Sequence, residues 1–168
     1  MRILFITNRF PGHFVCGDQM RAYQQIRHLS KRHAITLLAF ENAPPASPWL
    51  AEMEACCERV ITVKRGRIGM AWRLFCALGS RHPLQVAMYD SVPRGSGLEA
   101  LLCEGLFDLA HIQLARLGPM VERLAPLPCV LDFVDALSLN MARRAQLDRS
   151  PLRWVAQMEA SRLAVYEH

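Results

Sequence analysis

The chain begins with the apolar run MRILFIT at Met1–Thr7 and carries a second one, AITLLAF, at Ala34–Phe40. Between them lie the polar, turn-rich stretch Asn8–Asp18 and a helical pattern. This order predicts a strand, a long loop, a helix and a second strand, the βαβ unit that opens a parallel sheet. Ligands of such sheets bind beyond the carboxyl ends of the strands. The long loop therefore lies where a ligand is expected, and it brings Gly17 and Asp18 to a helix N-terminus.

The remainder of the chain alternates strands with helices. Further strands are predicted at Arg59–Val63, Leu109–Gln113 and Cys129–Val134, with a short strand or an extended linker at Leu84–Tyr89. Helices are predicted at Trp49–Glu58, Ile68–Leu78, Gly97–Gly105, from Pro119, at Ala136–Leu147 and at Pro151–His168. This order indicates an α/β fold with an open, doubly wound, Rossmann-like parallel sheet and helices on both faces.

The composition is that of one globular domain. The chain has 168 residues, of which 52% are hydrophobic and 21% charged, which suits a sizeable core and is too apolar for disorder. No apolar run reaches the ~20 residues of a membrane-spanning helix, and the N-terminus lacks a signal-peptide pattern, so a cytoplasmic location is expected. The net charge of +5 suits a phosphorylated ligand, an anionic membrane surface or nucleic acid, and does not choose among them.

Motifs for metals and dinucleotides are weak. The cysteines form no C-x-x-C pair, and His13 and Cys16 have metal-like spacing without a second pair nearby, so no metal site is expected. Gly95–Ala100 fits the pattern G-x-G-x-x-A but follows a turn-forming stretch, which favours a helix start; an NAD(P)-dependent oxidoreductase would need it to be a true fingerprint. The chain also lacks a Walker A motif, a G-x-S-x-G elbow and the basic-aromatic pattern of RNA-binding sheets, so no nucleic-acid partner is expected.

Polar residues near the first loop are candidate ligand contacts. Gly17 would let a phosphate approach the amides of a helix N-terminus closely, or it could serve a turn with positive φ. Asp18 could face the ligand or cap the helix. Arg21, one turn into the helix, could reach back toward the cleft or remain solvated.

Two later strand ends supply further candidates. Asp135 follows an apolar strand and should project into the crevice, with Ser138 close behind, although both residue types also suit a helix N-cap. Asp132 lies inside the predicted strand, and a structural, hydrogen-bonded role is expected because a buried carboxylate requires partners. Gln113, nearer the edge of its strand, is the better ligand contact, and His111 is expected to be a hydrogen-bonded core histidine.

These strand-end groups carry a family resemblance. Met1–Pro11, Gly17-Asp18-x-x-Arg21-Ala22-Tyr23, His33–Phe40 and Leu131–Asp135 with Ser138 resemble the N-terminal domain of family 4 retaining glycosyltransferases with the GT-B fold. The sequence is most similar to the sugar transferases associated with PEP-CTERM/exosortase exopolysaccharide clusters, over nearly the whole chain. The resemblance implies two Rossmann-like domains facing a cleft. Residues 1–168 would form the acceptor-side domain, and the donor-binding C-terminal domain, with its E-x7-E-type motif, would be absent from this chain.

The resemblance also implies roles for residues. Gly17 would offer its backbone amide to the diphosphate of a nucleotide-sugar donor. Asp135 stands where many relatives carry a histidine that contacts the transferred sugar, which leaves a hydrogen bond to a sugar hydroxyl as its expected catalytic contact. The leaving diphosphate is thought to assist, and neither a cofactor nor a metal is required. A glycan or lipid-linked acceptor is implied, in exopolysaccharide or cell-surface glycan synthesis, and the isolated chain is expected to be inactive.

Two helical segments bear on partners. Lys64–Leu78 places Ile68, Trp72 and Phe75 at helical spacing beside basic residues. An amphipathic helix that covers the sheet is expected there, and the basic flank also suits docking on an anionic leaflet, as a peripheral protein of the inner membrane.

The last predicted helix needs a surface for its apolar residues Trp154, Met158, Leu163 and Tyr166 and has no closing signal. A frayed terminal helix would account for this, but a chain that continues into a second domain is favoured. The alternative to a glycosyltransferase is a self-contained, non-catalytic nucleotide- or phosphate-binding α/β domain, which predicts a docked last helix.

Overall fold

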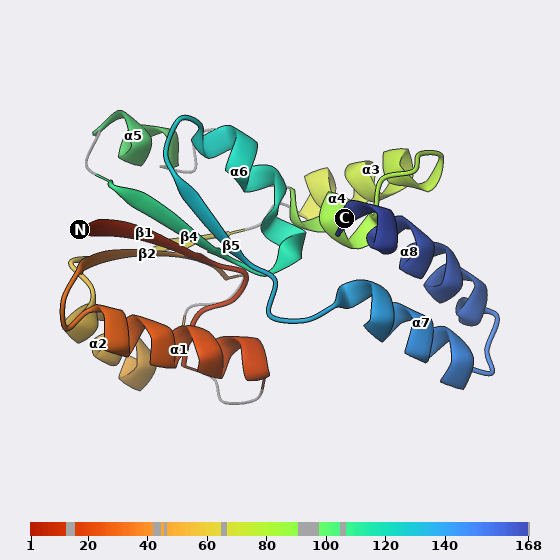
Figure 1. Cartoon of the computed structure of the whole chain (residues 1–168), viewed down its shortest axis with the longest axis horizontal. Helices are drawn as coiled ribbons and strands as arrows, with labels where there is room; N and C mark the ends of the chain where they lie inside the picture. The colour runs from red at the N-terminus through yellow and green to blue at the C-terminus, as the bar shows by residue number, and fades with distance from the viewer. Residues whose placement is uncertain are drawn as a thin grey trace.

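The computed structural model describes residues 1–12, 16–41, 45, 47–64, 67–90, 98–104 and 107–167. At its centre is an all-parallel, five-stranded sheet of order β3-β2-β1-β4-β5 (Figure 1). Its strands are β1 (Arg2–Thr7), β2 (Ala34–Phe40), β3 (Arg59–Val63), β4 (Leu109–Gln113) and β5 (Cys129–Asp132). The predicted α/β fold class with an open parallel sheet is confirmed.

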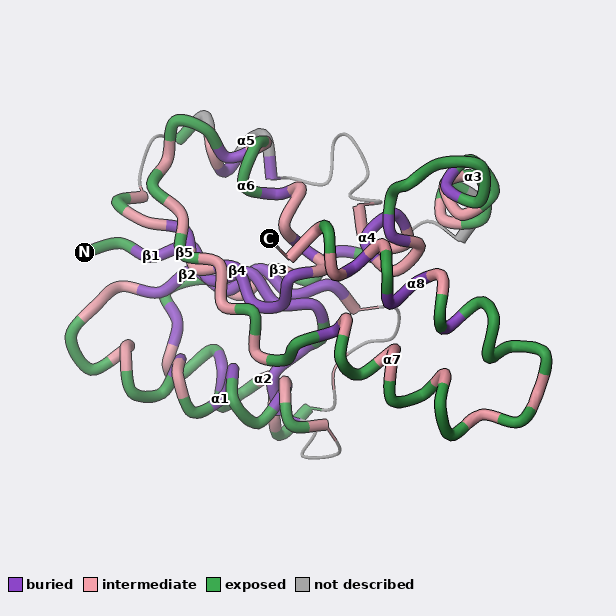
Figure 2. Tube along the Cα trace, turned by 45° about the vertical axis from the view of Figure 1, so that its right-hand side comes forward, coloured by how far each residue is buried: buried purple, intermediate pink, exposed green. Residues whose placement is uncertain are grey.

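Helices cover both faces of this sheet (Figure 1). One face carries α1 (Gly17–Leu29) and α2 (Ser47–Cys56), and the other carries α5 (Leu98–Cys103) and α6 (Pro119–Leu124). The side chains of β1 alternate between the two cores, with Phe5 beneath α1 and Leu4 and Ile6 on the α6 side. A strand buried on both faces has no polar side, which is why Ile3–Ile6 of β1 is an uninterrupted apolar run. Figure 2 shows the inner strands as the buried centre of the molecule, whereas the edge strands β3 and β5 are largely intermediate or exposed.

Four more helices and a short 3-10 turn lie beside the carboxyl edge of the sheet (Figure 1). They are α3 (Arg67–Leu78), α4 (Leu84–Tyr89), η1 (Ala115–Leu117), α7 (Leu137–Leu147) and α8 (Leu152–Tyr166). A small core of Val86, Ala115, Leu137 and Leu163 joins α4, η1, α7 and α8. Helix α8 is therefore docked through Leu163, whereas Trp154 remains 68% exposed.

Helix α4 corrects the prediction of a strand or linker at Leu84–Tyr89. Pro83 precedes its first turn, and the carboxylate of Glu159 in α8 accepts hydrogen bonds from the amides of Leu84 (2.9 Å) and Gln85 (2.8 Å). A carboxylate at a helix N-terminus stabilises the amides that have no partner within the helix. Because this carboxylate comes from a distant helix, the local sequence could not reveal it.

Strand β5 also ends earlier than predicted, at Asp132 instead of Val134. Val134 has φ +59°, a left-handed conformation that cannot continue a strand, and its amide donates to the Asp132 carboxylate at 3.1 Å. The predicted helix boundaries otherwise agree to within two residues where the structure describes them. His13, Gly105 and residues 95–97 of the dinucleotide-like loop lie outside the described residues.

The expectation that α3 covers the sheet is wrong. Trp72, Phe75 and Leu78 are 67%, 68% and 57% exposed, and the rings of Trp72 and Phe75 stack with centroids 6.1 Å apart. The helix packs on α4 instead, and Arg162 of α8 donates to the carbonyls of Ala77 (3.1 Å) and Leu78 (3.2 Å). Of the helices in the described ranges, none is long and apolar enough to cross a membrane.

Candidate functional site

The candidate cleft lies where the strand order reverses, between β1 and β4. The connection after β1 leads to α1 on one face, and the connection after the neighbouring strand β4 leads to α6 on the other. Neighbouring strands whose connections diverge leave a crevice beyond their carboxyl ends, the usual ligand site of open α/β sheets. A cleft of about 770 Å³ opens there, bordered by the first turn of α1 and by the segments that follow β1, β4 and β5.

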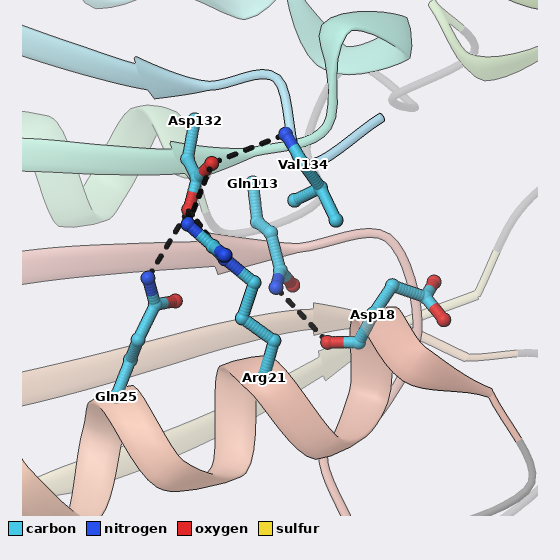
Figure 3. Close-up of polar contacts among 6 residues, drawn as sticks. All are labelled: Asp18, Arg21, Gln25, Gln113, Asp132 and Val134. Atoms are coloured by element: carbon cyan, nitrogen blue, oxygen red, sulfur yellow. Dashed lines mark hydrogen bonds and ion pairs between the residues drawn. The ribbon is translucent and has the colours of Figure 1, made fainter. Parts of the chain in front are cut away.

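Four of the predicted site residues line this cleft: Gly17, Asp18, Arg21 and Asp135. Two others serve as supports. The side-chain amide of Gln113, a residue only 2% exposed, donates to the Asp18 carbonyl at 2.9 Å and so ties the end of β4 to α1 (Figure 3). The hydroxyl of Ser138 donates to the carboxylate of Glu167. Direct contact of these two residues with a ligand stays a prediction.

The first turn of α1 is open toward the cleft. Its N-cap residue, Cys16, makes no side-chain capping bond, and Asp18 is already the second residue of the helix, so Asp18 does not act as its N-cap. Gly17 does not have a positive φ, and a Cβ added to it would have no neighbour within 4 Å. The glycine therefore serves neither a left-handed turn nor close packing within the protein. It leaves space in front of the amides of the helix N-terminus.

Asp132 joins α1 to β5 (Figure 3). Its carboxylate accepts hydrogen bonds from Arg21 through Nε at 3.0 Å and Nη2 at 3.3 Å, from the Gln25 amide at 3.1 Å and from the backbone of Val134. Burial disfavours the charged form, but the bonds from Gln25, Arg21 and Val134 outweigh it and lower the pKa of Asp132. The expected structural role of Asp132 is confirmed, and Arg21 is a tethered residue at the cleft wall.

Asp135 lines the cleft and does not cap a helix. The N-cap of α7 is Ala136, with no side-chain capping bond, so the capping alternative for Asp135 is not observed. Asp135 is exposed, and its carboxylate accepts no hydrogen bond from the described residues. Its backbone amide donates to the Phe133 carbonyl at 2.6 Å, which fixes the turn that carries it.

Both turns that carry the cleft walls hold unusual backbone conformations. Leu114, directly after β4, has φ +80°, and Val134, two residues after β5, has φ +59°. Left-handed conformations are rare for branched side chains, and each such position costs ~1–3 kcal/mol. Such positions persist where the surroundings hold them, and they cluster at functional sites. Both residues line the cleft.

Two arginines of the cleft were not among the predicted site residues. Arg9 follows β1, and its guanidinium donates to the Cys16 sulfur at 2.9 Å. Arg116 follows β4, and its guanidinium lies over the Tyr89 ring, 5.4 Å from the centroid. Neither forms an ion pair with another described residue, so both charges are available to an anion. The signal that locates Asp135, a position just beyond a strand end, could have found both.

His111 differs from the expectation of a hydrogen-bonded core histidine. Its ring stacks on Phe5 with centroids 4.4 Å apart, and its buried Nδ1 has no hydrogen-bond partner in the described part of the chain. Burial lowers the pKa of His111, although Asp132 opposes this shift. The histidine is therefore kept neutral beneath α1, close to the cluster around Asp132.

Comparisons with known proteins gave no match, whether with family models, curated proteins or solved structures. Within the described ranges, no group of three or more His, Cys, Asp or Glu residues could hold a metal ion. The site offers a helix N-terminus without a side-chain cap from its N-cap residue, two guanidinium groups that form no ion pair with a described carboxylate, and an exposed carboxylate on the opposite wall. This arrangement suits an anionic ligand that also carries hydroxyl groups.

The neutral state of His111 gives a prediction for pH. The folded protein resists protonation of this ring, whereas the unfolded chain takes up a proton near the ordinary histidine pKa of about 6.5. The free energy of unfolding should therefore fall as the pH is lowered through and below about 6.5. In urea titrations, His111→Phe should flatten this dependence, and the exposed control His28→Gln should retain it. An unaltered slope in His111→Phe would contradict the assignment.

Proposed function

We propose that this chain is the N-terminal, acceptor-side domain of a nucleotide-sugar-dependent glycosyltransferase in exopolysaccharide or cell-surface glycan synthesis. The observation that carries the proposal is the first turn of α1, where Gly17 leaves space before amides that the N-cap residue does not cap with its side chain, in a cleft that also presents Asp135. A second Rossmann-like domain would close the cleft from the other side and hold most of the donor. The proposal includes a nucleotide-diphosphate sugar as donor and a glycan or lipid-linked acceptor.

The diphosphate is assigned to the α1 side of the cleft. A helix N-terminus carries about half a positive charge, and its amides bind phosphate oxygens directly. Arg9 and Arg116 add two guanidinium groups that are not paired with described carboxylates. Charge-assisted hydrogen bonds from such groups stabilise the negative charge that grows on the diphosphate as it leaves.

Asp135 is assigned to the sugar. An exposed carboxylate is a strong acceptor for a sugar hydroxyl, and its negative charge favours the positive charge that develops on a sugar ring during transfer. Asp18, in the first turn of α1, is also available to sugar hydroxyls, and its charge acts on Arg9, whose pKa it helps to raise. Asp135 and the cations would thus orient the donor with its diphosphate toward α1.

A second candidate function is supported by α8. A self-contained domain that binds a nucleotide or phosphate without catalysis would need its last helix docked, and Leu163 of α8 is fully buried. Both candidates place the anion at Gly17. They differ in whether Asp135 takes part in a transfer reaction.

The anion site can be tested at Gly17. Adding a side chain there meets no protein atom with its Cβ but fills the space assigned to phosphate, so Gly17→Val should fold and lose affinity for nucleoside diphosphates. NMR titrations with UDP, GDP and ADP should move amide signals at residues 16–21 and 134–137 in the wild type and not in Gly17→Val. Gly79→Val, at another glycine with free space, is the matched control and should bind like the wild type. Equal affinity in Gly17→Val would refute the site.

The role of Asp135 can be tested in the longer protein that the proposal requires, since residues 1–168 alone should transfer no sugar. Asp135→Asn should lower kcat/KM about 100-fold, because a transition-state contact is lost, with little change in melting temperature. Glu54→Gln, an exposed carboxylate on α2, should leave both unchanged. Normal kinetics in Asp135→Asn, or transfer by residues 1–168 alone, would count against the proposal.

An anionic membrane surface is proposed as a partner through α3. Its exposed pair Trp72 and Phe75 lies on a helix that the exposed cations Lys64 and Arg81 flank in the sequence. Basic residues near an anionic surface add about 1 kcal/mol each. Co-sedimentation should be stronger with anionic than with neutral vesicles and should weaken with salt. The double variant Trp72→Ala/Phe75→Ala should lose it, whereas Trp154→Ala, an equally exposed tryptophan, should keep it. Equal retention on both vesicle types would exclude this partner.

A further inference from the structure

The last turn of α8 contacts both walls of the cleft from behind. The Glu167 carboxylate accepts hydrogen bonds from the backbone amides of Leu137 (2.8 Å) and Ser138 (3.3 Å) and from the Ser138 hydroxyl. The Tyr166 hydroxyl donates to the carbonyl of Ala115 at 3.3 Å. Leu137 lines the cleft, and Ala115 lies between the lining residues Leu114 and Arg116. One turn of helix therefore supports the wall after β4 and the wall after β5.

These contacts lie next to two residues with positive φ. The wall after β5 contains Val134 with φ +59°, and the wall after β4 contains Leu114 with φ +80°. A left-handed conformation at such residues persists only when the surrounding structure holds it. On the strand side, Asp132 holds the amide of Val134 at 3.1 Å. On the helix side, the carboxylate of Glu167 holds the amide of Leu137.

We propose that Glu167 is a positioning residue of the cleft, which fixes the segment that presents Asp135 by holding the first turn of α7. The inference rests on the proposed function, from which it takes a nucleoside diphosphate as the ligand of the cleft. Asp135 lies between the two anchored amides, and its own carboxylate has no partner in the described chain that could orient it. Its direction is set by the backbone alone. Loss of the Glu167 anchor releases one end of that backbone.

Tyr166 has the matching role on the opposite wall. Its hydroxyl lies so close to Gly118 that a Cβ at this position would overlap it, which explains the glycine between η1 and α6. Together with the buried Leu163, Tyr166 holds η1 against the last turn of α8. The spacing between the walls therefore depends on a helix that contributes no lining residue to the cleft.

The test separates positioning from plain stability. Glu167→Gln keeps the shape of the side chain but weakens its charge-assisted bonds, and Glu54→Gln, an exposed carboxylate on α2, is the matched control. With UDP as the probe at a temperature well below unfolding, Glu167→Gln should weaken binding about tenfold, because hydrogen bonds to charged groups contribute this much. Hydrogen exchange should accelerate locally at Leu137 and Ser138. Tyr166→Phe should weaken UDP binding without accelerating exchange at those two amides.

The outcomes are distinguishable from failure of the proposed function. A lower melting temperature with unchanged UDP affinity and unchanged local exchange would overturn the positioning role and leave the proposed function standing. Faster exchange at Leu137 and Ser138 with wild-type affinity would also overturn it, because the support would not reach the cleft. If the wild type binds no nucleoside diphosphate, the anion site at Gly17 that carries the proposed function fails. The anchor is then judged by exchange alone: local acceleration confined to residues 133–138 supports it, and wild-type exchange overturns it.

Discussion

The geometry of the cleft depends on the carboxylate of Asp132. It holds α1 through Arg21 and Gln25 and holds the turn after β5 through Val134, so one side chain sets the distance between the helix that offers amides and the segment that offers Asp135 (Figure 3). An ion pair that is only partly buried adds little stability by itself. The ion pair matters for geometry, because it joins α1 to the turn after β5, two segments that backbone pairing in the sheet does not connect.

The fold could be predicted from the sequence because the central strands are buried on both faces. Runs such as Ile3–Ile6 and Ile35–Phe40 have no polar side, and only a parallel sheet covered by helices buries them. The parallel, doubly wound arrangement followed from the alternation of strands and helices, and so did the expectation of a ligand beyond the first strand, whereas the strand order comes from the structure. The same reasoning placed Gly17, Asp18 and Asp135 correctly at its walls. It could have reached Arg9 and Arg116, which also follow strand ends.

The features that the sequence did not predict depend on residues that are distant in the sequence. Helix α4 forms where a strand or linker was expected, because Glu159 binds its first amides across 75 residues of sequence. Trp72 and Phe75 have helical spacing, which predicts one apolar face but does not say what it contacts, and α3 turns that face outward. His111 is half-buried and stacks on Phe5, and its buried Nδ1 has no hydrogen-bond partner among the described residues, which the sequence pattern alone could not show. The local sequence pattern predicts whether a segment is a helix or a strand, but the residues that this segment contacts are determined by the tertiary structure.

The N-termini of α1 and α7 border the cleft, and they differ in whether a carboxylate binds their first amides. The first amides of α7 are already bound to the carboxylate of Glu167, so an anion that enters the cleft finds that positive pole occupied. The first turn of α1 has no side-chain cap, and Gly17 keeps the space before it open. The carboxylate of Glu167 neutralises the pole of α7, whereas the carboxylate of Asp18 in the first turn of α1 is attracted to Arg9, so the α1 pole with its arginines remains the stronger attractor. The direction in which a diphosphate sugar would lie follows from this asymmetry: phosphate toward α1, and hydroxyl groups toward Asp135 beside the filled pole.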